Sequence, residues 1–235
     1  MARPSFLVGT SGWSFKEWKG SFYPKDLADD GLLSFYAARY PTVEINNTFY
    51  RMPRESVLLD WAAKVPPAFR FAIKASQRIT HHGRLKDVAD SVAYFTRVTS
   101  ELGERRGPTL FQLPPNLKKD LPRLADFLEL LPRRWDAAFE FRHASWLDDA
   151  VYDLLRSKGA ALVIADHDDF ETPVLATTTW SYARLHRATY DPAALASWVD
   201  RLRALEAETI YVFFKHDEAE GSGPDGAAAF LKLAS

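Results

Sequence analysis

Ionisable side chains follow short apolar runs along this sequence, and their types suit anion binding and proton transfer. Arginine and lysine bind phosphate or carboxylate groups, and a carboxylate held between cations stays ionised and serves as a general base or an orienting group. Histidine transfers protons near neutral pH. The cations outnumber the acids, which favours an anionic ligand. The cations are Lys74, Arg142, Arg184 and Lys215, and the acids are Glu44, Glu140 and Asp166.

These residues lie at the ends of eight apolar runs, and segments with helical periodicity separate the runs. Alternating strands and helices are typical of a parallel sheet covered by helices. Eight such units predict an α/β fold of the TIM (β/α)8-barrel type, in which the carboxyl ends of the strands converge on one mouth. The expected strands are 6–11, 42–46, 69–74, 109–112, 137–142, 161–166, 181–186 and 210–215.

Helices are expected between these strands from apolar stripes, aspartate or proline starts and glycine ends. The one after the sixth strand has the least support, because 170–178 is short and contains Pro173. The other expected helices are 32–39, 56–64, 87–102, 120–131, 148–158, 191–205 and 226–233.

The length of 235 residues predicts a single domain over 1–235. With 30 basic and 31 acidic residues, any polyanion binding requires local clustering of charge. Cysteine is absent, which excludes disulfides and thiolate chemistry. We expect a cytoplasmic protein with no membrane association, because no apolar stretch is long enough for a signal peptide or a membrane span.

Alternation along each strand indicates which side chains face the barrel interior. Glu44, Asn46 and Glu140 alternate with apolar residues that are expected to face the helices. Their own side chains are therefore expected to face the barrel interior. Buried charges must be paired, so the structural alternative is that Glu44 with Lys74, or Glu140 with Arg142 or Arg184, forms an ion pair that only fills the upper barrel. The side chains expected inside are Glu44, Asn46, Lys74, Gln112, Glu140, Arg142, Asp166, Arg184, His186 and Lys215.

From this set we predict a ligand site in the barrel mouth. The catalytic candidates are Glu44, Glu140, His186 and Asp166. The substrate-binding candidates are Asn46, Lys74, Gln112, Arg142, His143, Arg184, Lys215, Trp13 and Tyr50. Further histidines that could transfer protons are His143, His167 and His216.

A divalent metal is a second possibility for the same residues. Carboxylate oxygens and an imidazole nitrogen, as in Glu44, Glu140, Asp166 and His186, are ligands for Mg²⁺, Mn²⁺ or Zn²⁺. The neighbouring lysines and arginines would compete for these carboxylates, so we assign no metal ligand and expect no required cofactor.

The segment 12–31 is long for a loop after a strand and rich in aromatic residues. Trp13 and Trp18 alternate with cations, and bases stack on aromatic faces while cations contact phosphates. Arg78 and His81 add charge from another loop on the same rim. The same sequence pattern is also typical of aromatic residues that pack over the barrel.

Several motifs resemble one known family. They are Gly9-Thr-Ser-Gly-Trp13, the run 42–51 (TVEINNTFYR), Glu140-Phe-Arg-His143 and Tyr182-Ala-Arg-Leu-His186. The chain resembles the family called domain of unknown function 72, the YecE-like proteins, over nearly its whole length. The resemblance implies a TIM-barrel-like fold and no established activity. Many members have glycine where this chain has Arg187.

We therefore expect an enzyme of the hydrolase or lyase type that acts on an anionic, phosphate-bearing substrate. Arg142, Arg184 and Lys74 would hold the anion, with a carboxylate as base and His186 as proton donor. The alternative is a non-catalytic protein that binds a nucleotide or single-stranded nucleic acid through the loop 12–31 and the basic rim. No protein partner is inferred.

Overall fold

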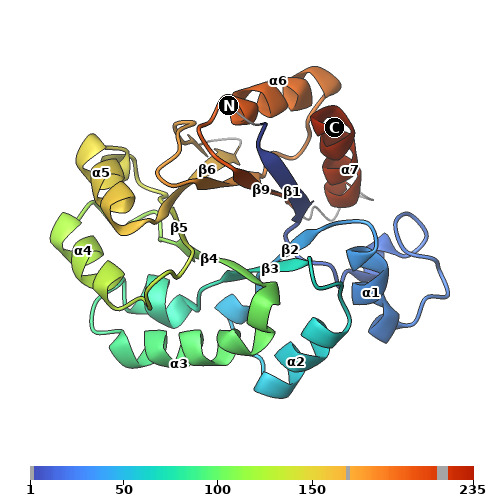
Figure 1. Ribbon diagram of the computed structural model, residues 1–235, viewed down its shortest axis with the longest axis horizontal. Helices are drawn as coiled ribbons and strands as arrows, with labels where there is room; N and C mark the ends of the chain where they lie inside the picture. Colours follow the sequence, from blue (N-terminus) through green and yellow to red (C-terminus); the bar gives the residue numbers. More distant parts are fainter. Residues whose placement is uncertain (1–2, 168–169, 216–221) are drawn as a thin grey trace.

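Eight parallel strands form a nearly closed barrel in the computed structural model, which describes residues 3–167, 170–215 and 222–235 (Figure 1). They pair in the order β1-β9-β8-β6-β5-β4-β3-β2, which confirms the predicted barrel. The strands are β1 (Ser5–Thr10), β2 (Thr42–Ile45), β3 (Arg70–Lys74), β4 (Arg106–Gln112), β5 (Ala137–Glu140), β6 (Ala161–His167), β8 (Trp180–Leu185) and β9 (Thr209–Phe214).

Helices surround the barrel (Figure 1). The aspartates predicted as helix starts are N-caps, because the side chains of Asp120, Asp148 and Asp191 each accept a backbone N–H of the first turn. Gly159 ends one helix with a φ of 66°. The helices are α1 (Leu32–Ala37), α2 (Glu55–Ala63), α3 (Ala89–Thr99), α4 (Leu121–Glu129), α5 (Asp149–Lys158), α6 (Pro192–Arg203) and α7 (Ser222–Ala234).

The repeat of strand and helix breaks after β6. The described residues there form β7 (Phe170–Glu171), a short strand that pairs antiparallel with β6. Thr172 and Thr177 then hydrogen-bond backbone groups of β6 and of the residue before it through their hydroxyl groups. The strand β5 pairs with β6 at only two positions. The segment that follows β6 therefore supplies hydrogen-bond partners for backbone groups of β6.

A tyrosine joins β1 and β2, the two ends of the order of paired strands. The hydroxyl group of Tyr36 on α1 accepts the Thr10 N–H at 2.8 Å and donates to the Thr42 carbonyl at 3.1 Å. The strands approach closely here, because a Cβ on Gly9 would lie 2.0 Å from the Thr42 oxygen. We call this Tyr36 junction the seam of the barrel.

Two hydrophobic clusters lie on opposite faces of the sheet. The larger one lies between the strands and the helices, whereas the inner one has small residues and two large aromatic rings. Small residues leave room for long polar side chains above them, at the carboxyl ends of the strands. The inner cluster is Ala72, Leu110, Ala138, Ala161, Val163, Ala165, Tyr182 and Phe213.

In the described part of the chain, no helix is both long and apolar enough to cross a membrane.

Candidate functional site

Arg184 lies at the centre of the upper barrel, where β8 ends, and only 4% of its side chain is exposed. Its Nε and Nη2 donate to Glu44 at 3.0 and 2.9 Å, and its Nη1 donates to Glu140 at 2.5 Å. Burial would lower the pKa of Arg184, but the two carboxylates raise it. This guanidinium therefore joins β8 to β2 and β5 through charge-assisted hydrogen bonds.

Glu44 accepts five hydrogen bonds and has no exposed surface. Besides Arg184, the donors are Ser11 Oγ at 2.8 Å, Asn46 Nδ2 at 3.0 Å and Tyr182 OH at 2.7 Å. Burial would raise the pKa of Glu44, but Arg184 and these donors lower it. The carboxylate is thus ionised and fully engaged.

Glu140 is held in the same way from other strands. Gln112 Nε2 donates to it at 3.1 Å, Arg142 Nε donates to the same oxygen, and His167 Nε2 lies 3.4 Å away. Burial would raise the pKa of Glu140, but Arg184, with His167 and Arg142, holds it well below its ordinary value. Arg142 keeps 26% of its side chain exposed, so it is the solvent-facing end of this arrangement.

Ser11 links His186 to Glu44. Its Nε2 is 3.2 Å from Ser11 Oγ. Because that hydroxyl gives its proton to Glu44, His186 Nε2 must be the donor in this contact. Burial, followed by the charge of Arg184, holds the pKa of His186 well below its ordinary value. The imidazole is therefore neutral, and its Nδ1 is the acceptor.

Lys74 at the end of β3 differs from its neighbours, because its ammonium group makes no hydrogen bond or ion pair within residues 3–167, 170–215 and 222–235. Nζ lies 4.4 Å from the centre of the Phe49 ring. Burial, followed by the charge of Arg184, lowers the pKa of Lys74 to about 8. The two carboxylates and two guanidinium groups below it already balance in charge, so a protonated Lys74 adds an uncompensated positive charge.

A π-helical turn, η4 (Arg78–His82), lies beside Lys74. The His81 ring contacts the Phe49 ring edge-to-face, with centres 4.8 Å apart. Burial, followed by the charge of Lys74, lowers the pKa of His81. Three non-glycine residues with positive φ follow the turn, and π-turns and such backbone strain are common at functional sites. They are Arg84, Leu85 and Asp87.

A cavity of about 590 Å³ opens beside the Glu44 end of this cluster. Ser11 and Asn46 line it next to Glu44, and aromatic residues line its walls. Within the described residues, the buried Asn46 Oδ1 has no hydrogen-bond partner. The aromatic residues that line the cavity are Trp13, Phe15, Tyr50 and Trp61.

The predicted site residues thus fall into two groups. The structure brings Glu44, Asn46, Lys74, Gln112, Glu140, Arg142, Arg184 and His186 together in the barrel mouth, and it places Trp13 and Tyr50 on the adjacent cavity. It places Asp166, His143 and Lys215 elsewhere. His216 lies outside the described residues.

The expectation that Asp166 faces the interior is wrong. Its neighbours in alternation, Leu162 and Ile164, belong to the cluster under the helices, so Asp166 lies on that outer face. Its carboxylate accepts Arg187 Nε at 2.6 Å and Tyr190 OH at 2.8 Å. The inner side of β6 carries small residues and ends at His167 instead.

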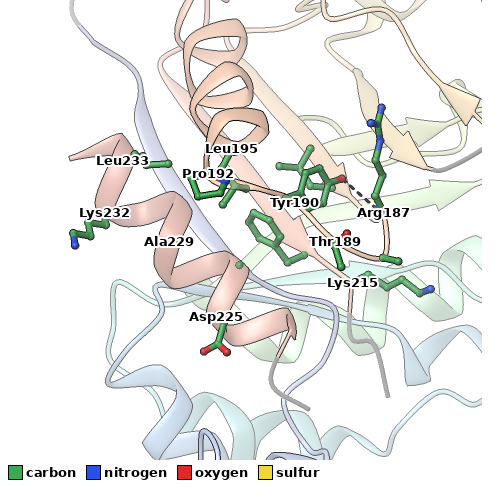
Figure 2. A pocket seen from close by; sticks show the side chains of 14 residues that line it. Arg187, Thr189, Tyr190, Pro192, Leu195, Lys215, Asp225, Ala229, Lys232 and Leu233 are labelled. Carbon is green, nitrogen blue, oxygen red and sulfur yellow. Dashed lines mark hydrogen bonds between the residues drawn. The ribbon is translucent and has the colours of Figure 1, made fainter. Parts of the chain in front are cut away.

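Lys215 and His143 also lie apart from the cluster. Lys215 lines a separate pocket of about 600 Å³, which Figure 2 shows between Arg187 and Tyr190 on one side and Asp225 of α7 on the other. The side chain of Lys215 is exposed and makes no hydrogen bond or ion pair with the cluster among the described residues, so a role for Lys215 in the mouth stays a prediction. His143 Nδ1 accepts the Ser145 N–H at 3.1 Å and so caps a short 3-10 turn.

Three residues of the cluster were not predicted from the sequence to contact Glu44 or Glu140. Ser11 and Tyr182 donate to Glu44, and His167 contacts Glu140. Alternation from Leu7 and Gly9 would have placed Ser11 inside. In the part of the chain that the structure describes, no three His, Asp or Glu side chains are grouped so that they could hold a metal ion.

The aromatic side chains of the loop 12–31 pack against one another and against α1, and three of them are buried. Trp18 and Tyr23 are 1% and 2% exposed, and the ring of Phe22 contacts those of Phe35 and Tyr40. Trp13 is also buried, and its carbonyl accepts the Tyr23 hydroxyl at 2.5 Å. The faces of Trp18 and Tyr23 are therefore unavailable for stacking with bases.

Fold and site together define an α/β barrel with a charged, hydrogen-bonded mouth. The model of the family described as "Protein of unknown function DUF72" matches residues 7–235, so the chain belongs to the DUF72 family. A crystal structure of a DUF72 family protein from Thermotoga maritima has a TM-score of 0.86 at 29% identity and covers 97% of this chain and 98% of that one.

Curated relatives support the same assignment. The UPF0759 protein YecE of Escherichia coli strain K12 is 32% identical over 167 residues, which are 68% of this chain and 58% of that protein. The UPF0759 protein YunF of Bacillus subtilis strain 168 is 28% identical over 154 residues, 62% of this chain and 54% of that protein. The matches thus span little more than half of the length of these relatives.

Proposed function

We propose that this protein is an enzyme of the hydrolase or lyase type that acts on an anionic, phosphate-bearing small molecule in the barrel mouth. The observation that carries the proposal is Lys74, an uncompensated ammonium group above a charge-balanced cluster. A phosphate group would supply the missing negative charge. Arg142, which is partly exposed, supplies donors beside it.

The roles within this proposal follow from which groups are engaged. Glu44 and Glu140 have their oxygens occupied and lowered pKa values, so they act as orienting groups. Arg184 holds these carboxylates and has no part in binding the anion. Proton transfer falls to His186, whose neutral ring is linked to Glu44 through Ser11.

The cavity beside Asn46 suits the uncharged part of such a substrate. Its aromatic walls provide stacking surface for such a group. Binding of a nucleotide or single strand remains a separate prediction, and the buried loop aromatics give it no support. The cytoplasmic location expected from the sequence likewise stays a prediction.

A thermal-shift screen tests this function, with phosphosugars, nucleotides, short oligonucleotides and divalent metal ions as probes. A ligand at a hundred times its dissociation constant stabilises the folded state by about 2.7 kcal/mol. We expect a phosphosugar to raise the melting temperature of the wild type and of Arg97→Ala, but not of Arg142→Ala. Arg97 is a suitable control because it pairs with Glu55 at the surface.

A positive ligand is then incubated with the protein, and released phosphate or a released carbonyl product is measured. Product formed by the wild type and lost in His186→Gln supports the enzyme. Oligonucleotide binding without turnover would instead favour the nucleic-acid alternative. If no phosphate compound shifts the melting temperature, the proposed function is wrong.

A further inference from the structure

Lys74 has the surroundings of an amine nucleophile. Its backbone is fixed, because Thr48 Oγ1 donates to the Lys74 carbonyl at 2.7 Å and β3 lies between β2 and β4. Its side chain extends inward from a strand end and is partly buried against Phe49. A lysine on a rigid element in a desolvated place next to other cations is the usual arrangement of a covalent lysine.

The nearby carboxylates do not hold Lys74 in an ion pair. Arg184 occupies both oxygens of Glu44 and one of Glu140, and Arg142 with Gln112 occupies the other. A structural lysine would be expected to take one of these partners. Lys74 instead remains available to a ligand.

Charge and burial around Lys74 raise its share of neutral amine. With a pKa of about 8, roughly a tenth of the amine is neutral at pH 7. An ordinary lysine, with a pKa of 10.5, has about one neutral amine in three thousand at that pH. The charged and titratable groups that face Lys74 from the surrounding elements are Glu44, Glu140, Arg142, Arg184 and His81.

We propose that Lys74 forms a covalent Schiff base with the carbonyl carbon of a phosphorylated aldehyde or ketone. This inference rests on the proposed function and narrows it to the lyase type. Once Lys74 is bonded to the carbonyl carbon, Arg142 holds the phosphate group. It is carried by the unpaired Nζ above the Phe49 ring, with the His81 ring on the same phenyl group.

The step balances without an added reactant. The neutral amine attacks the carbonyl carbon, the C–N bond forms, and the carbonyl electron pair moves to oxygen. His81, whose lowered pKa keeps it neutral, takes a proton from the nitrogen and passes it to that oxygen, which gives the neutral carbinolamine. His81 then transfers the second nitrogen proton to the hydroxyl group, so the C–O bond breaks, water leaves and the C=N bond of the imine forms. Protonation makes this imine a cationic electron sink.

Reductive trapping tests the covalent step. The intact protein is incubated with dihydroxyacetone phosphate, or with hydroxyacetone, which lacks the phosphate, and is then treated with sodium borohydride. Mass spectrometry of the peptides locates the adduct. We expect one adduct, on Lys74, with a yield at least tenfold lower in Lys74→Arg and unchanged in Lys158→Arg, because Lys158 pairs with Glu129 at the surface.

A second measurement needs no substrate. Reductive methylation with formaldehyde and cyanoborohydride is followed residue by residue from pH 6 to 11. We expect the rate at Lys74 to reach half of its maximum near pH 8, well below the ordinary lysine pKa of 10.5. A half-maximum for Lys74 at or above pH 10 would overturn the inference.

The outcomes separate this inference from the proposed function. If dihydroxyacetone phosphate raises the melting temperature and Arg142→Ala abolishes this shift, the phosphate site stands. The Schiff base is then wrong if neither carbonyl probe labels Lys74. Absence of both the melting shift and the adduct overturns both proposals.

Discussion

Arg184 and Glu44 form a two-point ion pair across the barrel, with Nε and Nη2 of the guanidinium 3.0 and 2.9 Å from the two carboxylate oxygens. The same guanidinium bonds Glu140 through its remaining nitrogen. One buried cation therefore fixes two carboxylates from strands on different sides of the mouth. The planar fork of arginine matches this geometry, and lysine has a single ammonium group that cannot reproduce it.

Loss of Arg184 should destabilise the fold strongly. Arg184→Met leaves Glu44 and Glu140 buried without their shared cation, and breaking a buried pair in this way costs about 3–5 kcal/mol. Urea denaturation at pH 7 measures the change. Arg97→Ala, which removes a surface pair with Glu55, should cost about 1 kcal/mol or less.

If Arg184→Met does not fold, Arg184→Lys serves in its place and should still lose more stability than Arg97→Ala. Equal losses in Arg184→Lys and Arg97→Ala would mean that the two-point geometry contributes little.

Stability should fall on acidification in two stages. The pKa of His186 lies well below its ordinary 6.5 in the folded protein, and those of Glu44 and Glu140 lie below 4.5. For each group the folded protein binds fewer protons than the unfolded chain between the two values, so stability rises with pH there. The loss therefore begins below pH 6.5 through His186 and steepens below pH 4.5.

The free energy of unfolding measured from pH 8 to 3.5 tests this dependence. His186→Gln should flatten most of the upper stage, to which His81 adds a smaller part because its pKa is lowered less, and Glu140→Gln should flatten the lower stage. An upper stage that persists in His186→Gln would assign it to another group.

Tyr36→Phe should weaken the barrel at its seam. The change removes one oxygen, yet it leaves the buried Thr10 N–H and Thr42 carbonyl without the partner that joins β1 to β2. An unsatisfied buried group costs about 1–3 kcal/mol. The same change at Tyr94, which is 51% exposed, is the matched control. Equal urea midpoints for the two variants would contradict the proposed role of Tyr36.

The sequence was sufficient to predict most of the fold and the composition of the cluster. Glu44 and Glu140 alternate with apolar residues, so their inward orientation follows from the period of a strand. The strand β6 is apolar on both faces over 161–165, which makes alternation uninformative there, and Asp166 was placed on the wrong face. The helix after β6 had the least support in the sequence, and the described residues there form the short strand β7 instead.

Pairing within the cluster could be predicted only in part, because it depends on side-chain reach across the barrel. The predicted pairs of Glu140 with Arg142 and with Arg184 are confirmed. Glu44 with Lys74 was one pairing that the sequence allowed. In the structure Arg184 takes both oxygens of Glu44, since its guanidinium reaches them together. Lys74 is left unpaired as a result, and nothing in its local sequence indicates this.

Lys74→Met should stabilise the protein, which is the opposite of what removal of an ion-paired lysine does. The folded protein holds the pKa of Lys74 at about 8, below its ordinary 10.5. The cost of burying protonated Lys74 is therefore complete below pH 8. Stability rises as the pH increases from 8 to 10.5, because the unfolded chain binds more protons than the folded protein there. Methionine keeps the apolar contact with Phe49 and removes the charge. We expect a gain of about 1–3 kcal/mol at pH 7.

Urea denaturation of Lys74→Met at pH 7 and pH 10 measures this gain, with Lys158→Met as the control for the loss of a surface lysine. The gain should shrink at pH 10, because the wild-type amine is then largely neutral. A residue that lowers the stability of the fold is typical of a functional site rather than of packing. Destabilisation by Lys74→Met would instead make Lys74 a structural cation, and the Schiff base would lose its basis.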